Sequence, residues 1–501
     1  MSMFLISFLP IILILILVLL FRKSLFFSAP LAFILTLFLS IFLWKISPAY
    51  AGASSLKGLF IAVEVTLIIF GALFFLDVMK KKGIIESIEY HLGRLSSDKR
   101  VQAIILAFMF GAFLEGAAGF GTPAAIVAPL LVGIGFPALI AVVICLIANS
   151  TSVVFGAVGT PIKLGFSGLD VTGVGFYAGL INLIIGTFVP LMIIAALVIM
   201  NSKEKRWHRI KEMIPFSIVS GLCFTVPYFI ISIFDFELPT LLGSLIGMVV
   251  LALIVRKKLF LPKDSWAFES KRNVKLSPKY SLLGSFLPYL IVVIALVLVK
   301  FINFRSVTYA IAEGISYSIN IFNPGIIFLI IALFFSLKSF SSIKYSFKDS
   351  FFKLEKAFIT LFFIAAFVQL MVNTNFNSSG LGSMISIISG FATTSAIPFL
   401  APFIGAFGAF IAGSATVSNL MLGKIHFQAA TALAISPQKI LALEVVGAAA
   451  GNMIALSNIV AAQATVKLHG QEERIIKINI IPCFIYLALA GTIGLILVYL
   501  F

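Results

Sequence analysis

Long uninterrupted apolar runs constrain this sequence more than any other feature. Residues 4–21 and 478–500 each supply the roughly 20 apolar residues that cross a hydrocarbon layer about 30 Å thick. Many comparable runs follow one another, and with 61% hydrophobic and 11% charged residues the chain departs from soluble proteins. The sequence therefore predicts an all-α polytopic membrane protein. The first run has no basic n-region and no Ala-x-Ala-like cleavage site, so we expect a retained span and not a signal peptide.

The positions of the basic residues predict the topology. Six loops hold 29 of the 36 Lys and Arg residues, and the positive-inside rule places these loops in the cytoplasm. Because successive loops alternate between the two sides of the membrane, we expect about 12 transmembrane helices in the cell membrane, with both termini outside. The net charge of +17 then reflects topology, and we expect the lipid bilayer and no nucleic acid as a partner. The basic loops are 22–24, 80–100, 201–212, 256–280, 337–356 and 467–477. The predicted spans are 3–21, 25–45, 58–79, 137–165, 175–200, 214–234, 238–255, 281–302, 323–337, 357–373, 438–466 and 478–500.

Two apolar segments, 101–136 and 396–435, do not fit this count. Each is broken by a glycine-rich or polar centre, and a single crossing by either one would invert every basic loop that follows it. We therefore predict that each is a re-entrant hairpin, which enters and leaves the membrane on the same side. The first opens to the cytoplasm and the second to the outside.

The two hairpins also reveal an internal repeat. Residues 111–116 (GAFLEG) and 408–413 (GAFIAG) share four of six positions, and each hairpin is followed by a span with a polar interruption, 137–165 and 438–466. The predicted organisation is a first inverted repeat at 1–200, an inserted helix pair with cytoplasmic loops at 201–280, and a second inverted repeat at 281–501. Inverted repeats with broken helices at matching positions indicate the midplane site of a secondary transporter, so we expect the broken centres to face one another.

The hairpin tips have the chemistry of a site for a small anion. Helix ends leave N–H groups unpaired, and their partial positive charge suits a carboxylate. Glycines let the backbone approach a ligand, and hydroxyl and amide side chains add hydrogen-bond partners. The alternative is that the small residues only allow close helix packing. The polar residues at the tips are Thr122, Ser414, Thr416, Ser418 and Asn419.

Glu115 is the most informative single residue, because an ionised carboxylate at membrane depth costs on the order of 3 kcal/mol. Burial favours the neutral form of a carboxyl group, which makes Glu115 a candidate proton carrier; a hydrogen bond that holds the hairpin shut is the alternative. Glu64 and Glu444 also lie inside apolar spans, with structural pairing or direct function as the two readings. Lys163 and the pair Lys424 and His426 could attract an anion or extend to the membrane interface.

The same sequence offers no enzyme and no metal site. It contains no HExxH or GxSxG motif and no paired aspartates at a spacing suited to catalysis. The three cysteines, Cys145, Cys223 and Cys483, lie in or beside apolar runs without a CxxC spacing. We therefore predict a protein that is not an enzyme and needs no cofactor.

The motifs FLEGAAGFGTPAAI (113–126), LIANSTSVVFGAVGTPI (146–162), GAFGAFIAGSATVSNLMLG and GNMIALSNIVAAQATV resemble those of the L-lactate permease family. This resemblance implies proton-coupled symport of L-lactate and related 2-hydroxy monocarboxylates such as glycolate and D-lactate. It also implies two re-entrant hairpins, elevator-like motion of a transport domain, and a scaffold that often forms a homodimer. Carried over by motif, the implied substrate-binding residues are Gly119, Gly121, Thr122, Asn149, Thr151, Ser414, Thr416, Ser418, Asn419, Asn452 and Asn458, with Gly159 in the same block and Glu115 as the proton-coupling residue.

The chain departs from the family's pattern beside the second block. Glu444 stands where the family usually has Gln, and Gln463, Lys424 and His426 stand where small or apolar residues are expected. The extra acid makes Glu444 a second candidate for proton coupling, or a residue that alters the pH optimum. A sodium-coupled carboxylate transporter and an anion channel stay open as alternatives, because oxygen ligands at broken helices bind Na⁺ and half-helices also build channels.

Overall fold

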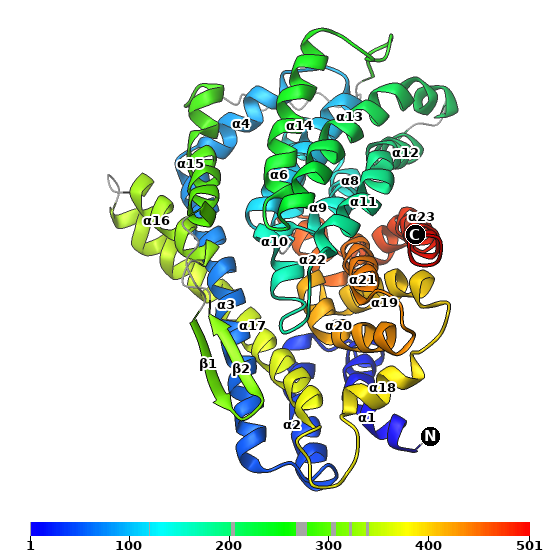
Figure 1. Cartoon of the computed structure of the whole chain (residues 1–501). Helices are drawn as coiled ribbons and strands as arrows, with labels where there is room; N and C mark the ends of the chain where they lie inside the picture. The colour runs from blue at the N-terminus through cyan, green and yellow to red at the C-terminus, as the bar shows by residue number, and fades with distance from the viewer. Residues whose placement is uncertain are drawn as a thin grey trace.

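The computed structural model describes residues 2–119, 121–201, 206–266, 278–301, 307–319, 323–336 and 340–501. Phe120 of the first predicted hairpin tip and parts of the basic loops 201–212, 256–280 and 337–356 lie outside these residues. The described part is built almost entirely of helices (Figure 1).

The first half of the chain forms the following elements: α1 (Ser2–Leu15), η1 (Ile16–Leu20), α2 (Leu25–Phe42), α3 (Pro48–Lys81), α4 (Ile84–Gly93), α5 (Lys99–Ala103), η2 (Ile104–Phe110), α6 (Gly111–Ala117), α7 (Thr122–Gly133), α8 (Ala138–Ala148), α9 (Ser150–Val153), α10 (Gly156–Lys163), α11 (Val174–Ile185), η3 (Gly186–Phe188), α12 (Val189–Asn201), α13 (Arg206–Phe234) and α14 (Pro239–Arg256). The second half forms α15 (Leu282–Phe301), β1 (Val307–Ala312), β2 (Ile315–Ile319), α16 (Pro324–Ser336), α17 (Phe340–Asn373), α18 (Met384–Phe391), α19 (Ile397–Ala412), α20 (Ala415–Ala432), α21 (Pro437–Gly451), α22 (Leu456–Thr465) and α23 (Glu472–Tyr499).

Helix length and composition confirm a polytopic membrane protein. Within the described residues, eleven helical runs are long and apolar enough to cross a membrane. Ten of them coincide with predicted spans, and the eleventh is the run Lys99–Ala117, which the sequence analysis assigned to the first hairpin. The predicted spans 137–165 and 323–337 are not among the eleven, because the first is split into α8, α9 and α10 and the second is the short helix α16.

A β-hairpin between α15 and α16 was not predicted. Strands β1 and β2 pair antiparallel around a turn that contains Gly314, whose φ of 73° favours glycine. The hairpin packs on α3, where Tyr317 stacks on Phe60 with ring centroids 5.6 Å apart. The Tyr317 hydroxyl donates a hydrogen bond to the Glu64 carboxylate. Glu64 is thus explained by pairing, which was the structural reading of this residue.

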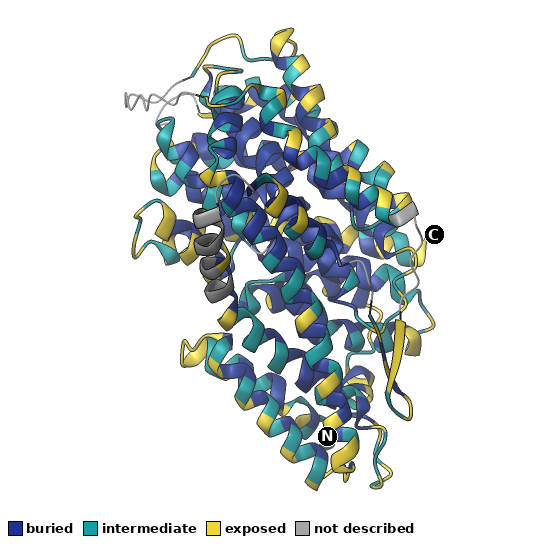
Figure 2. Cartoon of the chain, turned by 90° about the vertical axis from the view of Figure 1, so that its left-hand side faces the viewer, coloured by how far each residue is buried: buried dark blue, intermediate teal, exposed yellow. Residues whose placement is uncertain are grey.

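The buried side chains form two clusters. The smaller cluster joins α1, α2, the first half of α3, α17 and α18, and it also includes one face of α20. The larger cluster joins the other helices, and Figure 2 shows that burial is most complete in the middle of the molecule. The two clusters meet along α3 and α20, so α20 packs against both clusters.

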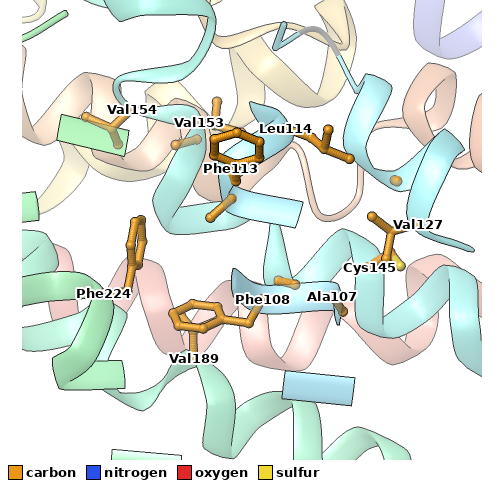
Figure 3. Packing of buried hydrophobic residues seen from close by; sticks show 14 of the residues in the cluster. Ala107, Phe108, Phe113, Leu114, Val127, Cys145, Val153, Val154, Val189 and Phe224 are labelled. Atoms are coloured by element: carbon orange, nitrogen blue, oxygen red, sulfur yellow. The ribbon is translucent and has the colours of Figure 1, made fainter. Parts of the chain in front are cut away.

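The run α5–η2–α6 lies in the larger cluster and is surrounded by protein. Its residues are buried throughout. Figure 3 shows Phe108 of η2 packed near Val189 and Phe224, and the rings of Phe108 and Phe224 meet edge to face with centroids 5.4 Å apart. On α6, a Cβ at Gly116 would lie 2.6 Å from the Leu241 nitrogen of α14. Irregular backbone after α6 is therefore shielded from lipid by protein, as a membrane interior requires.

Candidate functional site

The turn between α6 and α7 forms the first wall of the candidate site. Glu115 lies on α6 and is 2% exposed, and its Oε2 accepts a hydrogen bond of 3.1 Å from Asn149 Nδ2. Gly119 and Gly121 have φ values of 62° and 75°, a backbone region that glycine adopts at no steric cost. A Cβ at Gly119 would also lie 2.8 Å from the Ala157 Cβ. The hydrogen bond of Glu115 thus joins α6 to the end of α8 and not to the other arm of the predicted hairpin.

The second wall is the break between α8 and α10. Asn149 ends α8, and inside α10 three successive residues, Ala157, Val158 and Gly159, have left-handed φ values of 43°, 53° and 72°. For Ala and Val this conformation costs roughly 1–2 kcal/mol per residue, so neighbouring contacts must hold it. Such strain concentrates at functional sites. A Cβ at Gly156 would lie 2.5 Å from Glu115 Oε1, so the glycine at 156 makes room for the carboxyl group.

Side chains of other helices satisfy the carbonyl groups that this break frees. Thr240 of α14 donates to the Ser152 carbonyl at 2.8 Å, and the Tyr228 hydroxyl of α13 donates to the Thr151 carbonyl at 3.0 Å. The Thr151 hydroxyl lies 3.3 Å from the Tyr486 hydroxyl of α23. Asn182 of α11 closes this network with bonds of 2.8 Å to the Tyr228 hydroxyl and 2.6 Å from the Tyr486 hydroxyl. The broken helix is thus held in a fixed shape.

The third wall is the start of α20. Gly413 turns the chain with a φ of 69°, and the Ser414 hydroxyl caps the helix by accepting from the Val417 N–H at 3.4 Å. Ala415 and Thr416 follow in the first turn of this 18-residue helix. The N–H groups of a first helical turn have no partner within the helix and carry the positive end of its dipole.

The fourth wall is the break between α21 and α22. Asn452 ends α21, and its Oδ1 accepts a hydrogen bond of 3.3 Å from Asn458 Nδ2. The Asn458 Oδ1 faces the first turn, since a Cβ at Gly121 would lie 3.0 Å from it. The first turn is therefore in direct contact with the second break.

These four walls line one partly open cavity. It lies between α6, α9, α10, α20 and α21, and its space of about 260 Å³ includes open solvent. Its lining comprises Glu115, Gly119, Val153, Gly156, Ala157, Pro161, Gly413, Ser414, Ala415, Thr416 and Asn452. The expectation that the broken centres face one another is confirmed. Glu115 is the one ionisable residue of this lining, so backbone groups and the helix end supply any positive potential.

Several residues predicted as substrate-binding lie behind this lining. Their side chains make contacts within the protein: Thr122 Oγ1 donates to the Gly119 carbonyl at 2.8 Å, Thr151 belongs to the tyrosine network, Ser418 Oγ donates to the Gly405 carbonyl at 2.9 Å, Asn419 Nδ2 donates to the Pro161 carbonyl at 2.9 Å, and Asn458 supports Asn452. In this structure they shape the walls and do not line the cavity.

The charged residues near the second hairpin also differ from the expectation. His426 and Glu444 are buried and paired, with Nδ1 and Oε2 2.7 Å apart, so His426 does not extend to an interface. Lys163 forms an ion pair of 2.7 Å with Glu237. Lys424 lies over the Phe427 ring at 5.7 Å. Neither lysine lines the cavity.

Sequence reasoning missed Gly156, Ala157 and the network of Asn182, Tyr228 and Tyr486. Gly156 stands three residues before the GTP triplet of 159–161, and a further glycine in an apolar segment was an available signal. These three network residues lie on α11, α13 and α23, helices that are distant in sequence, and no local pattern indicates their contact. Within the described residues, no group of three or more His, Cys, Asp or Glu side chains is placed to hold a metal ion.

Comparison with known proteins identifies the family. The L-lactate permease family model matches residues 3–318 and 307–501. The chain belongs to this family. The L-lactate permease of Escherichia coli K12 is 28% identical over 92% of this chain and 89% of its own, and that of Bacillus subtilis is 28% identical over 82% and 81%. The glycolate permease GlcA of E. coli K12 is 27% identical over 95% and 92%.

The relatives are named permeases, that is, transporters, which confirms the prediction that the chain is not an enzyme. Among solved structures, the YdaH transporter of Alcanivorax borkumensis aligns with 85% of this chain and 84% of its own at 12% identity and a TM-score of 0.43. MtrF of Neisseria gonorrhoeae aligns with 86% and 81% at 15% identity and a TM-score of 0.41.

Proposed function

We propose that this permease carries L-lactate and related small 2-hydroxy monocarboxylates, glycolate and D-lactate among them, across the cell membrane together with protons. The family and the names of its lactate and glycolate permeases support the substrate class. The cavity lining supports a small polar substrate, since it combines glycines with the Ser414 and Thr416 hydroxyls and the Asn452 amide.

The substrate carboxylate binds at the start of α20 in this proposal. The Ala415 and Thr416 residues of the first turn line the cavity, and a helix N-terminus attracts an anion through its free N–H groups. The Ser414 and Thr416 hydroxyls and the Asn452 amide supply polar partners for the 2-hydroxyl group. A site without Lys or Arg binds its anion moderately, which suits a carrier that must release it.

Glu115 carries the coupled proton. It is the one carboxyl group in the cavity lining, and a charged carboxylate there repels the substrate carboxylate. Protonation of Glu115 removes this repulsion, so proton and anion bind together. This single observation, one acid that faces a cavity with a helix N-terminus opposite, carries the proposal.

Alternating access follows from the two predicted re-entrant hairpins. The pairs α6–α7 and α19–α20 each bring a turn to the cavity wall, and the broken helices complete it. We propose that these elements, the cores of two inverted repeats, move together as an elevator against the other helices, which also offer a homodimer interface. Midplane sites at broken helices are typical of secondary transporters.

Sodium coupling is the second candidate. Asn419 Oδ1 is buried without a hydrogen-bond partner among the described residues, and carbonyl and amide oxygens at broken helices are the ligands that Na⁺ prefers. A sodium site would lie behind the wall, between α10 and α20, since Asn419 Nδ2 bonds the Pro161 carbonyl there.

Purified protein in liposomes decides between these candidates. Labelled L-lactate is followed under an inward proton gradient, and then under a sodium gradient at equal pH on both sides. Accumulation driven by protons only, and lost with a protonophore, is the expected result. Accumulation driven by sodium would move the coupling site to Asn419, and equilibration without accumulation would point to a channel or uniporter and overturn the proposal.

A further inference from the structure

His426 and Glu444 form a charged pair that the cavity does not use. His426 lies on α20 and Glu444 on α21, and the imidazole Nδ1 and the carboxyl Oε2 share a hydrogen bond of 2.7 Å. The side chains are 2% and 0% exposed. The second carboxylate oxygen, Oε1, is buried and has no hydrogen-bond partner among the described residues. A buried carboxylate with one oxygen unsatisfied needs another form of compensation.

Among the described residues, no other charge supplies this compensation. The helices packed against α20 and α21 are α9, α10, α11, α17, α18, α19 and α23. Of these, α9, α18 and α19 contain no titratable residue, and the charged residues of α17 all precede residue 357. On α10, α20 and α21 the titratable groups have other partners: Lys163 pairs with Glu237, Lys424 lies over Phe427, and Lys439 contacts the Leu497 carbonyl and the Tyr177 ring of α11. On α23, Cys483 bonds the Ala450 carbonyl, Tyr486 bonds Asn182 and Tyr499 bonds the Ser395 carbonyl. The charged residues of α23 all precede residue 478.

The surroundings of the pair are closely packed. Gly405 of α19 lies against the Glu444 carbonyl, so that the two backbones are in contact, and its own carbonyl accepts from Ser418 of α20. In such an environment a net charge is costly, whereas an ion pair with its partner in place is tolerated. A neutral imidazole beside a carboxylate has a net charge of −1. One additional proton makes the pair neutral, either as imidazolium with carboxylate or as imidazole with carboxylic acid.

The pair is connected to the cavity through its helices. The start of α20, Ala415, lines the cavity eleven residues before His426, a distance of about 16 Å along a helix. Asn452 at the end of α21 lines it eight residues after Glu444, or about 12 Å. The contact between His426 and Glu444 thus fixes two helices that each present one end to the substrate.

We propose that His426 and Glu444 together bind one proton, separate from the proton on Glu115, and that this bound proton holds α20 against α21 and so positions the anion-binding end of α20. This inference rests on the proposed function only in the test that measures lactate exchange; the measurement of Tm does not depend on it. His426 and Glu444 are positioning residues, since neither lines the cavity. When the pair loses its proton at alkaline pH, a net charge is left inside the protein, the two helices separate, and substrate affinity falls.

The first test measures the KM of lactate exchange in proteoliposomes with equal pH on both sides, from pH 6 to 9. Each proton that must be bound for substrate to bind raises KM by up to tenfold per pH unit once it is lost. Wild type loses two such protons, from Glu115 and from the pair. Glu444→Gln retains an acceptor for His426 but binds no extra proton, so at high pH its KM rises tenfold less per pH unit than the KM of wild type. In Glu115→Gln/Glu444→Gln the KM does not rise with pH.

A packing effect would not produce this pattern. The control Ser418→Ala loosens the contact of α20 with α19 without a titratable group, and it is expected to change KM equally at every pH. If Glu444→Gln shows the same pH slope as wild type, the pair is not a proton site. Should Glu444→Gln not fold, His426→Gln/Glu444→Gln replaces the pair with two amides and is expected to give the same loss of slope.

A second measurement needs no substrate. The difference in Tm between wild type and Glu444→Gln is followed from pH 6 to 9 in detergent. A proton bound by the folded pair stabilises wild type at low pH, and this advantage is lost as pH rises. A Tm difference that does not change with pH overturns the proton site even if lactate transport is confirmed. A pH-dependent difference supports it even if the substrate proves to be another anion.

Discussion

Replacement of Glu115 by Gln is the sharpest test of the coupling mechanism. The substitution removes the one ionisable group of the cavity lining and keeps its shape. The amide oxygen still accepts the hydrogen bond that Asn149 Nδ2 donates at 3.1 Å. Any change in transport therefore reports the lost charge and proton, with little contribution from packing.

The size of the effect follows from Coulomb repulsion between two carboxylates. Two carboxylates about 6 Å apart repel each other by about 3 kcal/mol at an effective dielectric constant of about 20. This corresponds to about 100-fold in affinity. Wild type should therefore bind lactate about 100-fold more weakly when Glu115 is charged, and Glu115→Gln should bind it with the affinity of the protonated state at every pH.

Two assays on the same proteoliposomes measure this. Exchange of lactate at equal pH should persist in Glu115→Gln, and the part of its pH dependence that comes from Glu115 should disappear. Accumulation under an inward proton gradient should be lost at a pH at which the His426–Glu444 pair keeps its proton throughout, because the variant then takes up no proton with the anion. Glu64→Gln is the matched control, since Glu64 is an acid in an apolar helix that accepts from Tyr317 away from the cavity. Undiminished accumulation by Glu115→Gln would refute the role of Glu115.

Three further changes test other parts of the structure. Gly156→Ala places a Cβ 2.5 Å from Glu115 Oε1, which costs about 1–3 kcal/mol and should abolish transport, whereas Gly133→Ala, with nothing within 4 Å of the new Cβ, should not. Tyr228→Phe leaves the Thr151 carbonyl without its 3.0 Å hydrogen bond and should lower stability by about 1–3 kcal/mol, measured as Tm. Burial and the neighbouring Glu86 raise the pKa of Glu89 on α4 to about 8. Because the folded pKa exceeds the unfolded one, folding stability falls as pH rises from about 4.5 to 8, at about 1.4 kcal/mol for each unit of pKa difference. Glu89→Gln should therefore flatten the fall of Tm over this range, while Glu473→Gln on the exposed Lys477 pair should leave it unchanged.

The sequence alone predicted the parts of the site that depend on residue type. Glu115 is an acid in an apolar segment, and Gly119, Ser414, Thr416 and Asn452 interrupt apolar helices. Each of these exceptions to the hydrophobic pattern has a local signal, and the structure places all five in one cavity lining. Asn149, which donates to Glu115, was named only among the residues that the family resemblance implied.

Features imposed by tertiary contacts could not be predicted in this way. Ala157 and Val158 have left-handed backbones that their own side chains disfavour, so packing against Gly119 and the hydrogen bonds of Tyr228 and Thr240 must decide their conformation. The pairing of His426 with Glu444 depends on how α20 and α21 face each other. The β-hairpin is different, because Val307–Ala312 and Ile315–Ile319 alternate around Glu313 and Gly314, a strand signal that an analysis of long apolar runs does not detect.

The charge of the cavity links these features to the transport cycle. In the proposed mechanism the empty cavity contains ionised Glu115 and carries one negative charge. The loaded cavity contains neutral Glu115 and the lactate anion, and it also carries one negative charge. The two states that must cross the membrane therefore have the same electrostatic cost, and the walls need no separate cation for either. A cavity with both charges is disfavoured by repulsion of about 3 kcal/mol, which opposes uptake of lactate without its proton. A lysine in the lining would bind the anion more tightly but would stabilise this doubly charged state as well. The glycine turns and the helix end of α20 bind the anion without this loss of coupling, which gives a physical reason for a transport site built from backbone and a single acid.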